Sequence, residues 1–346
     1  MAISGYGSYR NRKRNTITYI IIASAVIIAA ALFFNPFSKK NKEATQNNPP
    51  ENIPPKKAEF NAAAQHNTAA LPVNFNNEPQ PGYEMVIAET NGQTDNRVTA
   101  LLSDAQADIK AGRIVSARDT LNSTLNMALT PSLSQSIKKQ LTALSNEWLF
   151  SRIVMLGDNL CTTYKVKPGD ILSEIGKRYS IPYQLIMKIN NISNERSLRA
   201  GQNLKVVQGP FHAMVYCSNF TMDLYLQNIY IKSYHVGLGK EGKDTPIGRW
   251  KVEIGGKLIK PTWTDPDTGK TYHADDPDYP LGSGWIALEG IDPRTRGIDG
   301  IALHGTKDED SIGTKSSRGC IRLYNGELME VYDMLEPGKS EIRIVE

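Results

Sequence analysis

The chain has 346 residues, which is too long for one small domain and favours two or three structural units. Its hydrophobic content of 40% is enough for ordinary cores, which excludes a globally disordered chain. The net charge is +4, but residues 1–42 hold seven basic and no acidic side chains, so the rest of the chain carries −3. No basic stripe that would follow a phosphate backbone remains, and the composition argues against nucleic-acid binding.

An apolar run covers residues 17–34, after a basic tail at residues 1–16. A helix of this length rises about 27 Å, close to the hydrocarbon thickness of a bilayer. We therefore expect a single-pass transmembrane anchor with a cytoplasmic N-terminus, because four basic residues precede the run and three follow it. A signal peptide cleaved near residues 29–31 is the alternative. Under both interpretations the bulk of the chain lies in the extracytoplasmic (periplasmic) space.

Two regions of different character follow the apolar run. Residues 35–95 are rich in Asn, Pro, Gln and Ala without periodicity, which predicts a disordered linker. Residues 96–151 carry apolar side chains at helical spacing, with a break at Gly112 and a new helix start at Thr130-Pro131. The region around Gly112 resembles one hairpin of the tetratricopeptide (TPR-like) type, and a single repeat is too short to form a solenoid. We expect a small helical support element, with partner binding as the alternative.

Residues 163–207 form a compact unit with clear element boundaries. A short strand begins at Thr163, and Pro168-Gly169 is typical of a turn. Asp170 is a suitable N-cap for a first helix, and Ile181-Pro182 opens a second one. Residues 204–207 return as a strand, which predicts the order β-α-α-β.

This unit resembles the LysM family. The resemblance rests on Tyr164-x-Val166-x-Pro168-Gly169-Asp170, on Asn190-Asn191 and on Leu198-x-x-Gly201-Gln202. It implies a βααβ domain that binds glycan containing N-acetylglucosamine. The implied contacts come from two loops, which hold Gly169, Asp170 and Ile171, and Asn191, Ile192 and Ser193. A mere spacer is the alternative.

Residues 210–346 are dominated by short β-branched or alternating runs separated by Gly and Pro clusters. Strands are expected at residues 214–217, 223–226, 229–237, 250–254 and 341–345. One late helix, at residues 327–335, has Asn325 as its expected N-cap. The pattern predicts a mainly β domain, a sandwich or barrel with few helices.

Two stretches in this domain carry residues suited to chemistry. Residues 301–305 contain His304 and residues 317–323 contain Cys320, and both alternate as strands do. If they pair as a long hairpin, opposed Cβ atoms lie about 4.5–5.5 Å apart, so an imidazole reaches a thiol. The thiolate is then the nucleophile and the imidazole its base. A structural cysteine is the alternative.

The neighbours of Cys320 suit acyl transfer. Gly319 removes side-chain bulk, so backbone N–H groups from Arg318 to Cys320 are candidates for an oxyanion hole. Arg322 lies two residues after Cys320, on the same face of a strand, where its guanidinium can bind a carboxylate. Trp263 and Trp285 are expected either to flank the substrate groove or to pack in the core.

Residues 210–346 as a whole resemble the L,D-transpeptidase (YkuD) catalytic domain. The matching motifs are Thr245-Pro246-Ile247-Gly248, Pro280-Leu281-Gly282 with Trp285-Ile286, His304-Gly305-Thr306, and Ser317-x-Gly319-Cys320-Ile321-Arg322-Leu323. The resemblance implies that Cys320 attacks a peptidoglycan stem peptide, that His304 is base and then acid, and that the carbonyl of Gly305 orients the imidazole. It also implies that Ser317 shapes the nucleophile's loop. Many members have His where this chain has Arg318, which leaves the role of that side chain open.

These resemblances predict a membrane-anchored peptidoglycan L,D-transpeptidase, a cysteine acyltransferase that takes no cofactor or metal and serves cell wall organisation and cell shape. Its expected partners are stem peptides, glycan strands and the cytoplasmic membrane. With water as acceptor the same site is an L,D-carboxypeptidase, and with a lysine it attaches a protein. A non-catalytic LysM scaffold is the alternative of another class. Cys161 and Cys217 are candidates for a disulfide in an oxidising compartment.

Overall fold

The computed structural model describes residues 96–346, all of which belong to one compact unit. The predicted basic tail (1–16), transmembrane anchor (17–34) and linker (35–95) lie outside the described residues. Within residues 96–346, no helix combines the length and the apolar character needed to cross a membrane.

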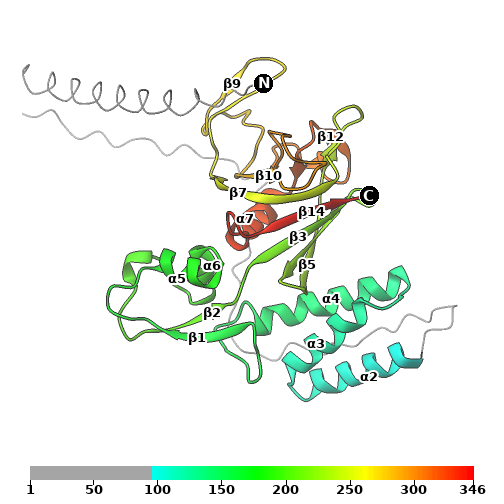
Figure 1. The fold of residues 1–346 in the computed structure, drawn as a ribbon, viewed down its shortest axis with the longest axis vertical. Helices are drawn as coiled ribbons and strands as arrows, with labels where there is room; N and C mark the ends of the chain where they lie inside the picture. Colours follow the sequence, from blue (N-terminus) through cyan, green and yellow to red (C-terminus); the bar gives the residue numbers. More distant parts are fainter. Residues whose placement is uncertain (1–95) are drawn as a thin grey trace, which may run out of the picture. The chain divides into compact units, whose positions relative to one another are not determined.

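Three helices form the first part of the described chain (Figure 1): α2 (Asn96–Lys110), α3 (Ile114–Leu125) and α4 (Pro131–Trp148). Their buried faces hold Leu102, Ala105, Leu121, Ile137, Leu141 and Leu144. The hydroxyl of Thr130 accepts a hydrogen bond from the N–H of Leu133, which confirms the predicted start of the third helix.

These helices contact both of the later domains through specific polar groups. Asn122 on α3 donates to the carbonyl of Asn228 and accepts from the N–H of Tyr230 in the β-rich domain. Lys205, which is 3% exposed, donates from the unit of residues 163–207 to the carbonyls of Ser151 (2.9 Å) and Ile153 (2.7 Å), just past α4. The helical region thus supports its two neighbours by direct contact.

The second unit has the predicted β-α-α-β order. β1 (Cys161–Lys165) pairs antiparallel with β2 (Asn203–Val207), and α5 (Leu172–Tyr179), α6 (Tyr183–Ile189) and a short 3₁₀ turn, η1 (Glu195–Ser197), lie between them. The predicted cap is wrong, because Ile171 occupies the N-cap position of α5 without a side-chain bond. Asp170 instead accepts from the hydroxyl of Tyr164 at 2.6 Å and the N–H of Lys167 at 2.7 Å, which fixes the preceding turn.

The β-rich domain contains one eight-stranded mixed sheet, in the order β13-β11-β10-β7-β14-β3-β4-β5. The bounds are β3 (Phe211–Tyr216), β4 (Thr221–Leu226), β5 (Ile229–His235), β7 (Gly248–Leu258), β10 (Trp285–Gly290), β11 (Ala302–His304), β13 (Ile321–Arg322) and β14 (Glu341–Val345). Two short ladders accompany it: β6 (Leu238–Gly239) with β12 (Lys315–Ser317), and β8 (Trp263–Thr264) with β9 (Thr271–Tyr272).

The predicted sandwich or barrel is wrong in detail, since one open sheet carries the domain. Helices take the place of a second sheet: α4 packs on β5 and α7 (Asn325–Met334) packs on β11 (Figure 1). Both helices therefore cover apolar residues of the sheet, as in a layered α+β arrangement. The mainly β character of the domain is as predicted.

The hypothesised disulfide is also wrong, because Cys161, Cys217 and Cys320 are all free thiols. Cys161 begins β1 and lies opposite Val207, which precedes the start of β3 by a few residues. Cys217 directly follows the other end of β3. A six-residue strand spans about 20 Å, far beyond the separation that a disulfide allows.

Candidate active site

A parallel strand pair positions His304 and Cys320. Leu303 lies opposite Ile321 and His304 opposite Arg322, so the predicted hairpin between these strands is wrong. Parallel strands need a crossover of about a dozen residues or more. Residues 305–320 supply it through a short 3₁₀ turn, η2 (Glu309–Ser311), and β12, which pairs with β6. The connection between His304 and Cys320 is therefore a crossover and not a hairpin loop.

His304 is held as a buried, neutral imidazole. It is 4% exposed, and its Nδ1 lies 2.5 Å from the carbonyl oxygen of Gly305. The ring of Trp285 stacks on it, with centroids 5.7 Å apart. Burial, and to a smaller extent the charge of Arg322, lower the pKa of His304 to about 4, against the opposing effect of the Gly305 carbonyl. A neutral ring whose Nδ1–H faces a carbonyl has Nε2 left as a proton acceptor.

Cys320 lies in the turn that leads into β13, with its side chain partly exposed. Its thiol donates to the carbonyl of Gly300 at 3.3 Å. Burial raises the pKa of Cys320, while the N–H of Ala302 and the charge of Arg322 oppose that rise. Among the interactions of residues 96–346, no hydrogen bond joins the thiol to His304. Near neutral pH the two groups are therefore a thiol and a neutral imidazole rather than an ion pair.

Ser317 shapes the nucleophile's turn. Its hydroxyl donates to the carbonyl of Cys320 at 2.6 Å and accepts from the N–H of Gly319 at 3.1 Å. Gly319 has φ +111°, a conformation that side chains rarely adopt, and a Cβ there would meet Ile301. Because the N–H of Gly319 is taken by Ser317, the N–H groups of Arg318 and Cys320 are the remaining oxyanion-hole candidates. The prediction that all three N–H groups are available needs this correction.

Arg322, near Cys320 and His304, has a buried N–H group without a hydrogen-bond partner in the described part of the chain. Its Nη1 donates to Ser316 at 3.2 Å, but its Nε is buried and has no partner among residues 96–346. Its charge acts on both Cys320 and His304. An unpaired buried N–H is costly unless a ligand satisfies it. The predicted carboxylate-binding role of Arg322 stays a prediction, and the unpaired Nε is compatible with it.

Sequence reasoning missed a second role for Asn325. It was predicted as a helix N-cap, but that position belongs to Tyr324. The side chain of Asn325 instead accepts from the N–H of Ser283 and donates to the carbonyl of Thr306, both at 2.9 Å. It thereby ties the loop before β10 to the segment that follows His304. Gly282 and Gly305, both within the family motifs, were the available signal, since a Cβ at either would collide with this amide.

The predicted glycan-binding residues lie in the loops before α5 and after α6. Gly169 has φ +85° and Ile171 is 57% exposed. In the second loop Asn191 and Ser193 are exposed. Ile192 is 9% exposed and packs in the core, so its side chain is not available to a ligand.

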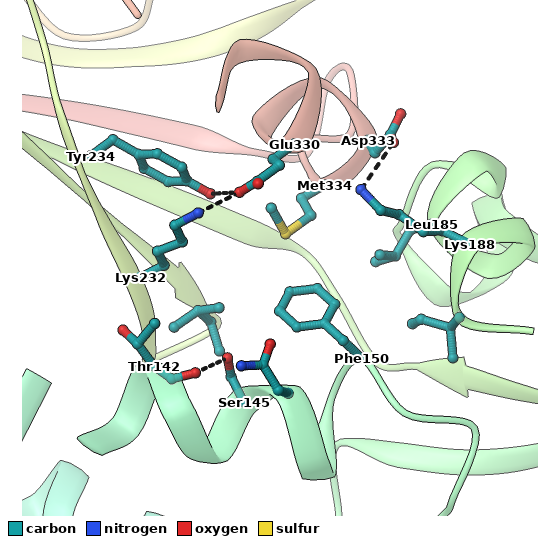
Figure 2. Close-up of a pocket in the computed structure, with 13 residues that line it drawn as sticks. Thr142, Ser145, Phe150, Leu185, Lys188, Lys232, Tyr234, Glu330, Asp333 and Met334 are labelled. Atoms are coloured by element: carbon teal, nitrogen blue, oxygen red, sulfur yellow. Dashed lines mark hydrogen bonds and ion pairs between the residues drawn. The ribbon is translucent and has the colours of Figure 1, made fainter. Parts of the chain in front are cut away.

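A separate cavity of about 200 Å³ lies between α4, α6, β5 and α7 (Figure 2), and Cys320 is not among its lining residues. Phe150 and Met334 form part of its apolar wall, as Figure 2 shows. Its charged groups are already paired: Lys232 with Glu330 at 2.7 Å, and Lys188 with Asp333 at 3.8 Å. This cavity marks the meeting point of the three regions and shares no residue with the site of Cys320 and His304.

The free thiol of Cys320, the carbonyl-bound neutral imidazole of His304 and the unpaired Nε of Arg322 together form a candidate cysteine acyl-transfer site. Residues 210–344 match the family model of the L,D-transpeptidase catalytic domain (YkuD), and residues 164–207 match that of the LysM domain. The chain therefore contains a LysM domain followed by an L,D-transpeptidase catalytic domain, which makes it an enzyme of the L,D-transpeptidase class.

Curated relatives agree with this assignment. A putative L,D-transpeptidase YkuD of Bacillus subtilis is 27% identical over 183 residues, which cover 51% of this chain and 94% of the relative. The putative L,D-transpeptidase YqjB of the same organism is 35% identical over 107 residues, which cover 30% of this chain and 54% of the relative. Among solved structures, the catalytic domain of an E. faecium L,D-transpeptidase is matched at a TM-score of 0.30 and 21% identity, over 39% of this chain and 95% of that one.

Proposed function

We propose that this protein is a peptidoglycan L,D-transpeptidase that forms cell-wall cross-links through a thioester on Cys320. The observation that carries the proposal is the 2.5 Å contact between His304 Nδ1 and the carbonyl of Gly305. It fixes the tautomer and leaves Nε2 to act as base towards the thiol. The partly exposed Cys320, the neutral imidazole and the free Nε donor of Arg322 support the same function.

The first half-reaction would acylate the enzyme. Rotation about the Cα–Cβ bond of Cys320 brings Sγ from the Gly300 carbonyl towards the imidazole, and Nε2 of His304 takes its proton. The sulfur bonds to the carbonyl carbon that precedes the terminal D-Ala of a tetrapeptide stem, and N–H groups of Arg318 and Cys320 stabilise the oxyanion. The amide C–N bond then breaks, and D-Ala leaves with the proton from His304.

The second half-reaction would transfer the acyl group. An amine of another stem peptide attacks the thioester carbonyl, and His304 takes the amine proton. The C–S bond then breaks, and His304 returns that proton to the sulfur, which restores the Cys320 thiol and the neutral imidazole. Arg322 would bind a stem carboxylate through its unpaired Nε and so orient the donor. Water in place of the amine makes the same site an L,D-carboxypeptidase, and a protein lysine would give protein attachment.

We further propose that the LysM domain targets the enzyme to glycan strands and that the catalytic region works outside the cytoplasm, held at the membrane by residues 17–34. The exposure of Ile171, Asn191 and Ser193 supports glycan contact at the two loops.

Incubation with purified muropeptides and mass analysis of the products tests the reaction. Cross-linked dimers with loss of D-Ala are expected from the wild-type protein and absent with Cys320→Ala. Shortened stems without dimers would identify a carboxypeptidase instead. Unchanged muropeptides in the presence of folded wild-type protein would favour a wall-binding scaffold.

A further inference from the structure

A separate hairpin leaves the main sheet beside His304. The segment of residues 259–284 begins where β7 ends, at Leu258, and ends where β10 begins, at Trp285. Leu258 and Trp285 face each other in the ladder, and Trp285 also faces His304 on β11. Within the segment, β8 and β9 pair only with each other. Both ends of this hairpin segment are therefore anchored next to the imidazole, and its tip has to be held by other contacts.

Asp265 organises the tip of the hairpin. Its Oδ1 accepts from the N–H groups of Asp267 at 2.8 Å and Thr268 at 3.1 Å. The N–H of Gly269, which has φ +70°, donates to the Asp265 carbonyl and closes the turn. The rings of Trp263 and Tyr272 stand side by side on the two strands, 6.0 Å apart. The tip is thus a defined structure with its carboxylates in fixed positions.

Arg318, two residues before Cys320, reaches this tip. Its Nε donates to Asp267 at 2.7 Å and its Nη2 lies 3.2 Å from both carboxylate oxygens of Asp265. The Asp265 side chain is only 13% exposed, and that of Arg318 is 36% exposed. Burial disfavours the charge on Asp265, yet the N–H groups of Asp267 and Thr268 and the Arg318 guanidinium lower its pKa. The contact is therefore an ion pair at neutral pH.

A second ion pair fastens the same segment from the histidine side. Lys307, three residues after His304, lies 2.6 Å from Asp278. The hydroxyl of Tyr279 donates to the carbonyl of Pro261 and closes the base of the segment. Residues adjoining each of the two reactive groups thus hold the segment in place.

We propose that Arg318 is a positioning residue that fastens the hairpin of residues 263–272 to the nucleophile's turn, so that the hairpin is one wall of the groove leading to Cys320. The identity of the peptide in that groove rests on the proposed function, but the fastening does not. Partly exposed ion pairs shift an equilibrium only about two- to fivefold each, so the wall can open, more readily at high salt.

Two measurements on Arg318→Gln test the fastening and the wall separately. Amide hydrogen exchange in residues 265–270 is expected to quicken about four- to twenty-fivefold, the combined effect of two such pairs. In a Cys217→Ser background, labelling of Cys320 by a bulky fluorescent maleimide should quicken several-fold relative to labelling by iodoacetamide. The matched control is Arg249→Gln, which removes the exposed pair with Glu341 on β7 and β14.

A charge reversal keeps the test specific. Arg318→Glu should open the hairpin further, and Asp267→Arg added to it should restore slow exchange and the wild-type labelling ratio. If Arg318→Gln does not fold, Arg318→Lys gives the same readouts with one charge retained. With muropeptides, Arg318→Gln should raise KM by a similar factor, because the wall must then be ordered on binding.

Unchanged exchange and an unchanged labelling ratio in Arg318→Gln would overturn the proposal. Faster exchange with an unchanged ratio would overturn its second half, since the hairpin would then be fastened without lining the groove. Failure of the proposed function is a different result, namely no muropeptide product from the wild-type protein, and it leaves both of these readouts intact.

Discussion

The Nδ1 atom of His304 faces the carbonyl of Gly305, its own neighbour in the chain, at 2.5 Å. A partner that is a backbone atom cannot titrate, whereas a carboxylate partner would stabilise an imidazolium. Burial therefore dominates, and the pKa of His304 falls to about 4. His304 therefore stays unprotonated throughout the neutral range, as the proposed base must.

The acid limb of the pH–rate profile reports this pKa. Turnover, read as kcat/KM, should fall only as the pH approaches about 4, because protonation removes the base there. An unperturbed histidine would lose activity about 2.5 units higher, near pH 6.5. Steady-state kinetics between pH 4 and 8, with unfolding monitored in parallel, measures the limb. A midpoint near 6.5 would contradict the buried, neutral imidazole.

The same pKa predicts how stability depends on pH. The folded-state pKa lies below the unfolded value of 6.5, so only the unfolded chain takes up this proton between pH 6.5 and about 4. Stability is therefore fully present above pH 6.5 and falls as the pH drops, by about 3 kcal/mol at pH 4. Denaturant unfolding of wild type and His304→Gln should show a difference that shrinks in this window. A difference independent of pH would contradict the prediction.

Asn325 is expected to matter for stability and activity together. Asn325→Ala leaves the N–H of Ser283 and the carbonyl of Thr306 without their partner, which costs about 1–3 kcal/mol. It also frees the segment after His304, so kcat should fall. Thermal unfolding and muropeptide turnover measure the two effects. Asn228→Ala, at an exposed position, is the control. Equal stability and equal turnover of the two variants would show that Asn325 does not support the site.

Ile171 gives a test of glycan targeting that leaves the fold intact. Deletion of the LysM domain would also remove Lys205 and its bonds to Ser151 and Ile153, so a point change is sharper. Ile171→Asp should weaken co-sedimentation with insoluble peptidoglycan and leave turnover of soluble stem peptides unchanged. Leu156→Asp, at a fully exposed apolar residue outside the domain, is the matched control. Equal sedimentation of both variants would identify the domain as a spacer.

The sequence predicted the elements better than their pairing. Alternation identified β11 and the strand after Cys320, and turn residues identified all four elements of the LysM domain. Alternation says nothing about strand direction, which is why a hairpin was expected where β12 crosses over and β13 runs parallel to β11. Short connections favour hairpins, and the crossover could be recognised only from its length.

Side-chain contacts were predictable where a motif specifies them and not where several polar groups compete. His304 contacts the Gly305 carbonyl and Ser317 bonds within the turn of Cys320, as the resemblance implied, whereas the catalytic roles of these residues stay predictions. Asn325 and Asp170 both looked like helix caps, since a local rule applies to each, but each bonds to a more distant partner. The ion pairs of Arg318 join residues about fifty positions apart, which no local pattern reveals.

Acylation by a carbapenem tests most directly whether Cys320 is the nucleophile and His304 its base. Resemblance to L,D-transpeptidases implies that carbapenems trap such a thiol, because opening of the β-lactam ring by sulfur leaves a slowly hydrolysed thioester. Intact-protein mass spectrometry of the wild-type protein should show one added inhibitor mass, none in Cys320→Ala, and formation about 10²- to 10⁴-fold slower in His304→Ala. A folded wild-type protein that takes up no inhibitor, or an adduct that persists in Cys320→Ala, would contradict it.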